Sequence, residues 1–189
     1  MQKRPKLIVL TGGPGAGKTT VLDTAKHMFF KKALVLHEAA SMIYNGGFLR
    51  SSTPMAIQAA QRAIYYIQRE QERIIEKDHT NLVGLCDRGA LDGLAYWPDS
   101  KEDFFKSLGT TEAEELDRYE AIIHLRTPTE ELGYSRKNSA RTETVDEAMK
   151  LDQRTFDAWK NHPKHHVVDS RQDFLHKMEE VIGIISKYI

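Results

Sequence analysis

Five short apolar runs are spaced along the chain and are separated by longer segments with helical periodicity. None of the runs alternates cleanly between apolar and polar residues, which is typical of parallel strands that are buried on both faces of a sheet. We therefore predict five strands, at residues 6–11, 33–38, 81–86, 121–126 and 165–169.

Apolar spacing and capping signals predict helices between these strands. Apolar residues recur at three- and four-residue steps over residues 54–77 and again over residues 172–189, which indicates amphipathic helices. Thr144 and Glu147 form a capping-box pattern that opens a further helix toward Trp159. Strands that alternate with helices in this way predict an α/β fold.

Composition and charge name no partner for this chain. Its 189 residues have the length of one domain, which we place at residues 1–189. The 27 basic and 27 acidic residues cancel, so no overall field draws the protein to nucleic acid or to a membrane. Cys86 lies in an apolar run, which favours a buried, inert thiol. The first apolar stretch, of about five residues, is too short for a signal peptide or a membrane span, and we expect a cytoplasmic protein.

The segment "TGGPGAGKTT" comes directly after the first predicted strand and precedes the helical stretch at residues 19–30. Its glycines and lysine match the P-loop pattern in the strand, loop and helix context that the motif requires. The backbone N–H groups of such a loop surround phosphate oxygens at a helix N-terminus, where the helix dipole also favours an anion. The alternative is a glycine-rich turn that arose by chance. The predicted nucleotide-binding residues are Gly12, Gly13, Pro14, Gly15, Ala16, Gly17, Lys18, Thr19 and Thr20.

A magnesium site is expected beside this loop. In the P-loop motif the lysine, here Lys18, reaches the β- and γ-phosphates, and the hydroxyl of the next residue, Thr19, ligates Mg²⁺. The apolar run "LVGLCD" ends in Asp87, and a neighbouring strand would bring this carboxylate beside the loop, where it holds Mg²⁺ through water. Alternatively, Asp87 caps the next turn.

A polar segment at residues 127–144, "TPTEELGYSRKNSARTET", is the least regular part of the chain. Long irregular loops in compact domains are often functional, and we interpret this one as a mobile lid. Arg136 and Arg141 on the lid would close over the nucleotide and neutralise the charge that spreads over the transferring phosphoryl group. Solvated surface arginines are the alternative.

Two large classes of P-loop protein are disfavoured by the residues on the C-terminal side of the loop. Small GTPases read guanine with Asn-Lys-x-Asp after a strand, and this tetrapeptide does not occur in the sequence. AAA+ motors usually place a glutamate directly after the Walker-B aspartate, whereas the residue after Asp87 is Arg88. The chain is also too short for the helical lid domain of those motors.

The combination of motifs resembles the nucleoside and nucleotide kinases and, more narrowly, the NadR-like AAA-domain family of P-loop proteins. The matching segments are "LTGGPGAGKTT", "HEAASMI", "AIYYIQREQER", "LCDRGALDGLAYW" and "SARTETVDEAMKLDQ". This resemblance implies a three-layer α/β/α sandwich on a five-stranded parallel sheet of order 2-3-1-4-5 with a lid. It also implies ATP, or GTP, as the nucleotide, together with Mg²⁺.

Glu38 and Arg88 are the candidates for the acceptor side of the site. A carboxylate at the end of the second strand can take the proton of an acceptor hydroxyl and align it with the γ-phosphate; otherwise Glu38 caps the following helix. Arg88 either binds substrate hydroxyls or phosphate or forms a structural bridge to Glu38. Gln61 and Gln68 lie on the third helix, where a kinase reads its acceptor.

The histidine-rich segment "NHPKHH" invites a metal hypothesis for His162, His165 and His166. Consecutive strand residues point to opposite faces, so His165 and His166 cannot easily share one ion. We therefore do not predict a metal there.

The leading hypothesis is an ATP-dependent kinase that phosphorylates a small, nucleoside-like hydroxyl acceptor. In this hypothesis the catalytic residues are Lys18, Glu38, Asp87, Arg88 and Arg141. A nucleotide-operated switch or ATPase that controls partner binding is the alternative from another class. A polynucleotide 5′-kinase is a weaker third hypothesis, because the sequence has no obvious basic track for a strand. The acceptor, the preference for ATP over GTP and the oligomeric state do not follow from the sequence.

Overall fold

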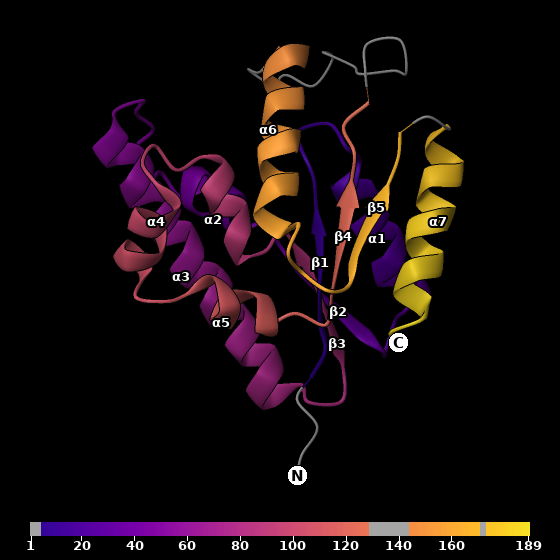
Figure 1. The fold of residues 1–189 in the computed structure, drawn as a ribbon. Helices are drawn as coiled ribbons and strands as arrows, with labels where there is room; N and C mark the ends of the chain where they lie inside the picture. Colours follow the sequence, from indigo (N-terminus) through magenta and orange to yellow (C-terminus); the bar gives the residue numbers. More distant parts are fainter. Residues whose placement is uncertain (1–4, 129–143, 171–172) are drawn as a thin grey trace.

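The computed structural model describes residues 5–128, 144–170 and 173–189 (Figure 1). The strands are β1 (Leu7–Thr11), β2 (Ala33–Leu36), β3 (Val83–Asp87), β4 (Ala121–Leu125) and β5 (His165–Val168). The helices are α1 (Lys18–Met28), α2 (Ala39–Asn45), α3 (Pro54–Asp78), the 3₁₀ helix η1 (Ala90–Ala95), α4 (Lys101–Leu108), α5 (Glu112–Asp117), α6 (Val145–Trp159) and α7 (Phe174–Ser186).

The five strands form one parallel sheet in the order β2-β3-β1-β4-β5. This is the predicted order, and the prediction is confirmed. β1 lies at the centre, where Leu10 is in register with Asp87 of β3 and Thr11 with His124 of β4. All strands run in the same direction, so their carboxyl ends meet at one edge of the sheet, which is where open α/β sheets bind ligands.

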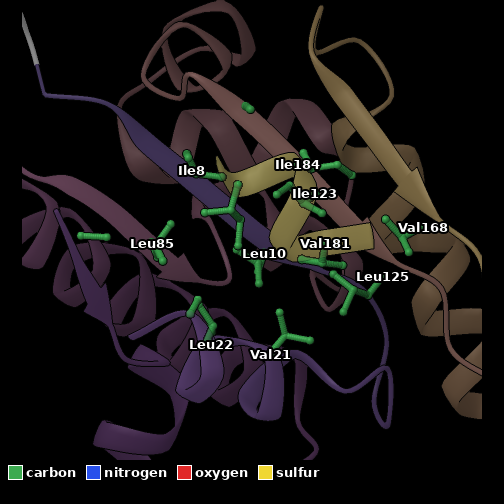
Figure 2. Packing of buried hydrophobic residues seen from close by; sticks show 14 of the residues in the cluster. Ile8, Leu10, Val21, Leu22, Leu85, Ile123, Leu125, Val168, Val181 and Ile184 are labelled. Carbon is green, nitrogen blue, oxygen red and sulfur yellow. The ribbon is translucent and has the colours of Figure 1, made fainter. Parts of the chain in front are cut away.

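Helices cover both faces of the sheet, because successive residues of a strand point to opposite sides. Ile8 and Leu10 of β1 pack with α1 and α7, where Val21 and Val181 belong to the same buried cluster (Figure 2). On the other face, Leu7, Val9 and Cys86 belong to a second buried cluster with side chains from α3, η1, α4 and α6. The predicted three-layer α/β/α sandwich is therefore confirmed, and Cys86 is buried as expected.

The long helices begin at or close to their predicted first residues. The Thr53 side chain accepts a hydrogen bond from the Ala56 backbone N–H at the start of α3, and the capping box of Thr144 and Glu147 opens α6. The α7 helix begins slightly later than the apolar pattern suggested, because Asp173 accepts two backbone N–H groups and acts as its N-cap.

Four short elements, α2, η1, α4 and α5, were not predicted from the apolar pattern. Each has between six and eight residues, which is about two turns and too short to show a helical period. Both edge strands are also shorter than expected: β2 ends at Leu36 and β5 at Val168. Glu38 therefore lies beyond the strand, at the N-cap of α2. No helix in the described part of the chain is long and apolar enough to cross a membrane.

Candidate active site

The glycine-rich loop joins β1 to α1 at the carboxyl edge of the sheet. Gly12 has φ 129°, and a Cβ atom there would lie 2.0 Å from the carbonyl oxygen of Leu125 in β4. Gly17 has φ 93° and forms the N-cap of α1. Both positions need the left-handed φ values that glycine adopts readily. The sequence thus lets the loop turn sharply beside β4 and direct the N-terminus of α1 toward the site of an anion.

Lys18 is the buried cation of the loop, with 8% of its surface exposed. Its Nζ atom donates hydrogen bonds to the carbonyl oxygens of Gly12 at 2.9 Å and of Gly13 at 3.0 Å. Burial, followed by the neighbouring charge of Arg88, lowers the pKa of Lys18 from its ordinary value of 10.5 to about 7. Burial and the charge of Arg88 thus favour the neutral amine over the ammonium form, against the opposing charge of Asp87.

A nucleotide should change that balance, and the change is measurable as proton uptake. Phosphate oxygens beside Nζ favour the charged amine, so they raise the pKa of Lys18 above about 7. Below that pH the amine is already protonated and binding takes up no proton at this group. Above it, binding takes up part of a proton, and nucleotide affinity falls as the pH rises. Calorimetric titration at pH 8 in buffers of different ionisation enthalpy should show this uptake; equal apparent enthalpies in all buffers would contradict it.

Asp87 and Thr19 are the two residues predicted to hold Mg²⁺, and both carry side-chain oxygen atoms. Asp87 ends β3 next to β1, and no residue in the described ranges donates a hydrogen bond to its carboxylate. Burial raises the pKa of Asp87, against the opposing effect of Lys18, so this carboxylate would gain from a nearby cation. Thr19 lies exposed in the first turn of α1. Hard oxygen donors of this kind suit Mg²⁺, and these two residues would hold it.

Arg88 occupies the turn after β3 in a strained conformation, with φ 73°. Nonglycine residues in this region cost about 1–3 kcal/mol and often cluster at functional sites. Its Nε atom donates to Glu38 Oε1 at 2.7 Å, and its Nη1 atom donates to Asp92 Oδ2 at 3.1 Å and to the Gly12 carbonyl oxygen at 3.4 Å. Arg88 therefore forms the structural bridge to Glu38 that was one of its two predicted roles.

Glu38 is held from two sides at the start of α2. Oε1 accepts from Arg88, and Oε2 accepts from the Ser41 hydroxyl at 2.5 Å. Burial favours the neutral acid, but the charge of Arg88 and the hydrogen bond from Ser41 hold the pKa of Glu38 below its ordinary value. Although Glu38 is the N-cap residue, its side chain makes no capping hydrogen bond to the described backbone of α2. The carboxylate is therefore paired with Arg88, which in turn contacts the P-loop at the Gly12 carbonyl oxygen.

Asp92 of η1 belongs to the same site, although the sequence did not single it out. Its carboxylate accepts hydrogen bonds from Thr11 Oγ1 at 2.8 Å, Arg88 Nη1 at 3.1 Å and Trp159 Nε1 at 2.7 Å. The donors come from β1, the turn after β3 and α6. Asp92 is the last residue of the segment "DRGALD", but only the tertiary fold brings the three donors to its carboxylate.

Because this carboxylate is 3% exposed and has three donors, Asp92→Asn should destabilise the fold. The amide would place an N–H group against one of these donors, and we expect a loss of about 3 kcal/mol in the free energy of unfolding. Urea unfolding monitored by circular dichroism measures the change. Asp99→Asn, on the exposed side of the same region, is the matched control and should change stability little. Equal stabilities of the two variants would contradict the role of Asp92.

Gln61 and Gln68 of α3 are both buried. Gln68 Nε2 donates to Glu72 Oε1 at 3.0 Å, and Tyr119 Oη donates to the same oxygen at 2.7 Å. Gln68 is thus engaged in an internal polar network under α3, whereas Gln61 lies beside Gly93 of η1. Of the two, Gln61 lies beside η1, the helix that carries Asp92.

The three histidines of "NHPKHH" have separate surroundings. His162 Nε2 lies 3.0 Å from the Tyr119 carbonyl oxygen, and His166 Nε2 lies 2.8 Å from Tyr188 Oη. His165 packs against His124 with 5.8 Å between the ring centroids. Among the residues that the structure describes, no group of three or more His, Cys, Asp or Glu side chains is placed to hold a metal ion.

The segment predicted to form a lid follows β4. Arg136 and Arg141 lie outside the described residues, as does nearly all of the segment at residues 127–144. At its start, Thr127 Oγ1 donates to the Pro14 carbonyl oxygen at 3.2 Å. The chain therefore leaves β4 in contact with the P-loop before it enters this segment.

A glycine-rich loop between the first strand and helix of a parallel sheet, with an aspartate ending the adjacent strand, defines a P-loop kinase or NTPase. A family model described as an AAA domain matches residues 7–177, and the chain belongs to this family. The prediction is thereby confirmed at the level of the family, and the narrower NadR-like resemblance stays a prediction. Comparison with characterised protein sequences gives no match.

Solved structures share the fold at low sequence identity. Deoxyadenosine kinase from M. mycoides with bound dATP matches with a TM-score of 0.67 and 15% identity, over 95% of this chain and 99% of that chain. The structure described as the same kinase with the products dCMP and a flexible dCDP matches with a TM-score of 0.65 and 16% identity, over 96% and 99%. At these sequence identities the comparison shows a shared fold and nothing further.

Proposed function

We propose that this protein transfers the γ-phosphoryl group of Mg-ATP to a hydroxyl group of a small, nucleoside-like acceptor. The observation that carries the proposal is the placement of Glu38. Its ionised carboxylate is held by Arg88, and Arg88 in turn contacts the P-loop at Gly12. A base and a phosphate-binding loop joined through one arginine give the two halves of a phosphoryl-transfer site.

On the nucleotide side, residues 12–20 bind the phosphates. The loop N–H groups and the α1 N-terminus favour the anion, and Lys18 exchanges its bonds with the Gly12 and Gly13 carbonyl oxygens for the terminal phosphates. Thr19 and Asp87 would hold Mg²⁺, which would supply positive charge against the phosphate oxygens. Arg136 and Arg141, which lie outside the described residues, remain candidates to neutralise the same phosphate charge.

On the acceptor side, Glu38 orients the hydroxyl and receives its proton as the hydroxyl oxygen bonds to the γ-phosphorus and the bond from that phosphorus to the oxygen of the leaving ADP breaks. Its low pKa keeps it ionised at neutral pH, so it is ready to accept a hydrogen bond, and positioning is the main contribution that phosphoryl transfer requires. Arg88 fixes the carboxylate and offers its remaining N–H groups to the acceptor. The solved deoxyadenosine kinase structures, which share the fold, support the nucleoside-like class.

One observation favours the alternative, a nucleotide-operated switch or ATPase. Glu38 and Arg88 already form an ion pair, with 2.7 Å between Arg88 Nε and Glu38 Oε1. A switch needs no phosphate acceptor beside this pair. In that case the pair would link the P-loop to α2 and report the state of the nucleotide.

A ligand screen by thermal shift separates the two functions. Nucleosides, ribosylnicotinamide and short oligonucleotides are tested with and without a Mg-bound nonhydrolysable ATP analogue, because a bound ligand raises the melting temperature by mass action. A kinase should be stabilised further by one class of small nucleoside-like acceptor in the presence of the analogue. Stabilisation by the analogue alone, with no response to any acceptor, would favour the switch. Glu38→Gln serves as the matched variant for acceptor binding.

A further inference from the structure

Asp152 on α6 is a buried carboxylate that has no part in the proposed transfer reaction. Its side chain is 4% exposed. Oδ1 accepts hydrogen bonds from the Gly13 backbone N–H at 2.9 Å and from His124 Nε2 at 3.0 Å, and Oδ2 is 3.1 Å from Arg126 Nε. These partners, two hydrogen-bond donors and one ion-pair partner, come from the P-loop, from β4 and from the residue after β4, so Asp152 joins α6 to the phosphate site.

The P-loop and α6 also touch at van der Waals distance. A Cβ atom on Gly13 would lie 2.4 Å from Thr127 Oγ1, 2.7 Å from Asp152 Cβ and 2.9 Å from the Ala148 carbonyl oxygen. No side chain could be accommodated between the loop and the helix. Figure 1 shows α6 beside β1 and the loop that leaves this strand. The loop at Gly13 therefore packs directly against α6 and Thr127.

The Gly13 residue is held through both of its polar backbone groups. Its N–H donates to Asp152, while its carbonyl oxygen accepts from Lys18 Nζ at 3.0 Å. When Lys18 turns to the phosphates of a nucleotide, the bond to the carbonyl oxygen is lost and the bond to Asp152 remains. Asp152 is then the strongest polar anchor of this part of the loop, because a hydrogen bond to an ionised acceptor is stronger than a neutral one.

We propose that Asp152 is a positioning residue for the P-loop, an inference that rests on the proposed nucleotide site. From α6, Asp152 holds the Gly13 backbone N–H and thereby keeps the loop in the phosphate-binding conformation. It touches no substrate in this role and acts through the loop. Preorganisation of this kind increases affinity, because the loop does not need to be ordered when the ligand binds.

The charge around Asp152 suits this role. Burial favours the neutral acid, but the hydrogen bonds from His124 and Gly13 and the charge of Arg126 hold the pKa of Asp152 below its ordinary value. The Nε2 atom of His124 must carry a proton to donate to this carboxylate. Its Nδ1 atom has no hydrogen-bond partner among the described residues, so within them Asp152 is the group that orients the ring by hydrogen bonding. Lys177 contributes a further positive charge from α7.

The test is Asp152→Asn, which keeps the shape of the side chain but removes its charge. The change weakens the hydrogen bond from the Gly13 N–H and places an amide N–H group against either the Arg126 guanidinium or the two donors at Oδ1. We expect the dissociation constant of the Mg-ATP analogue to rise about tenfold, with the acceptor KM unchanged. Titration with a fluorescent nucleotide, at a temperature at which circular dichroism shows every variant folded, measures this change. A dissociation constant within twofold of the wild type would overturn the inference.

Two control variants on α6 separate positioning from a general loss of stability. Thr155 is also buried, and its hydroxyl bonds only to the Leu151 carbonyl oxygen among the described residues; Thr155→Ala should lower the melting temperature without changing nucleotide affinity. Asp157 is exposed, and Asp157→Asn removes the same charge from the same helix with no expected effect on affinity. If Thr155→Ala weakens nucleotide binding as much as Asp152→Asn does, the role of Asp152 is structural and the inference fails.

A measurement on the wild type keeps the inference testable if Asp152→Asn does not fold. The Gly13 amide should exchange with solvent as slowly as the amides of β1, both without nucleotide and with it, because Asp152 holds it in both states. Exchange at the rate of a free loop amide would overturn the inference. The proposed function fails in a different way: wild-type protein would then not bind Mg-nucleotide or would not transfer phosphate, whatever the Asp152 variant does.

Discussion

Lys18→Ala is expected to abolish phosphoryl transfer and to weaken the binding of Mg-nucleotide. Lys18 is the buried cation of the glycine-rich loop, and it reaches the Gly12 and Gly13 carbonyl oxygens where the terminal phosphates would lie. Loss of one positioned cation or donor in such a site typically costs about a hundredfold or more in turnover. Steady-state kinetics and nucleotide titration measure the two effects.

Lys26→Ala is the matched control for this prediction, because Lys26 lies on the same helix but is exposed. It should leave turnover and affinity unchanged. If Lys18→Ala binds and turns over nucleotide like the wild type, the P-loop is not the nucleotide site, and both the kinase and the switch hypotheses fall.

Glu38→Gln is expected to keep nucleotide binding but to lose transfer to the acceptor. The amide oxygen can still accept from Arg88 Nε, as the carboxylate does at 2.7 Å, so the local fold should survive. The amide cannot take a proton, and the loss of general-base assistance alone typically costs about a hundredfold or more in rate. We expect a fall in kcat with a nearly unchanged nucleotide dissociation constant.

Glu70→Gln provides a matched control, because Glu70 is also paired with an arginine, Arg73, at 2.8 Å, but on the exposed face of α3. It should have wild-type kinetics. A Glu38→Gln protein that transfers phosphate at the rate of this control would show that Glu38 is not the base and would remove the support for the acceptor site.

The parts of this molecule that can be predicted from the sequence are those with a local signal. Strands buried on both faces give continuous apolar runs, and the glycine-rich loop has its own spacing, so the sheet elements and the P-loop could be predicted directly. Strand order came from the resemblance to a known family, since apolar runs carry no information on which neighbours pair. The short elements α2, η1, α4 and α5 have too few turns to show a period.

The site residues that could not be predicted are defined by contacts over long separations. Asp92 is surrounded by Thr11 and Trp159, which are 81 and 67 positions away, and Asp152 meets Gly13 over 139 positions. An acid in an amphipathic helix looks the same in sequence whether it is solvated or holds a loop. The left-handed backbone conformation of Arg88 could not be predicted either, because arginine rarely adopts it and nothing in the residue type indicates it.

The central claim, that the phosphate held by the P-loop is given to a small acceptor, is tested most directly by following the label from γ-labelled ATP. Wild-type protein and Glu38→Gln are each incubated with Mg²⁺, labelled ATP and a pool of nucleosides, and the products are separated. A kinase predicts label on a nucleoside-like metabolite with the wild type and about a hundredfold less with Glu38→Gln. Label that appears only as free phosphate, at equal rates with both proteins, would contradict the kinase function and favour the nucleotide switch.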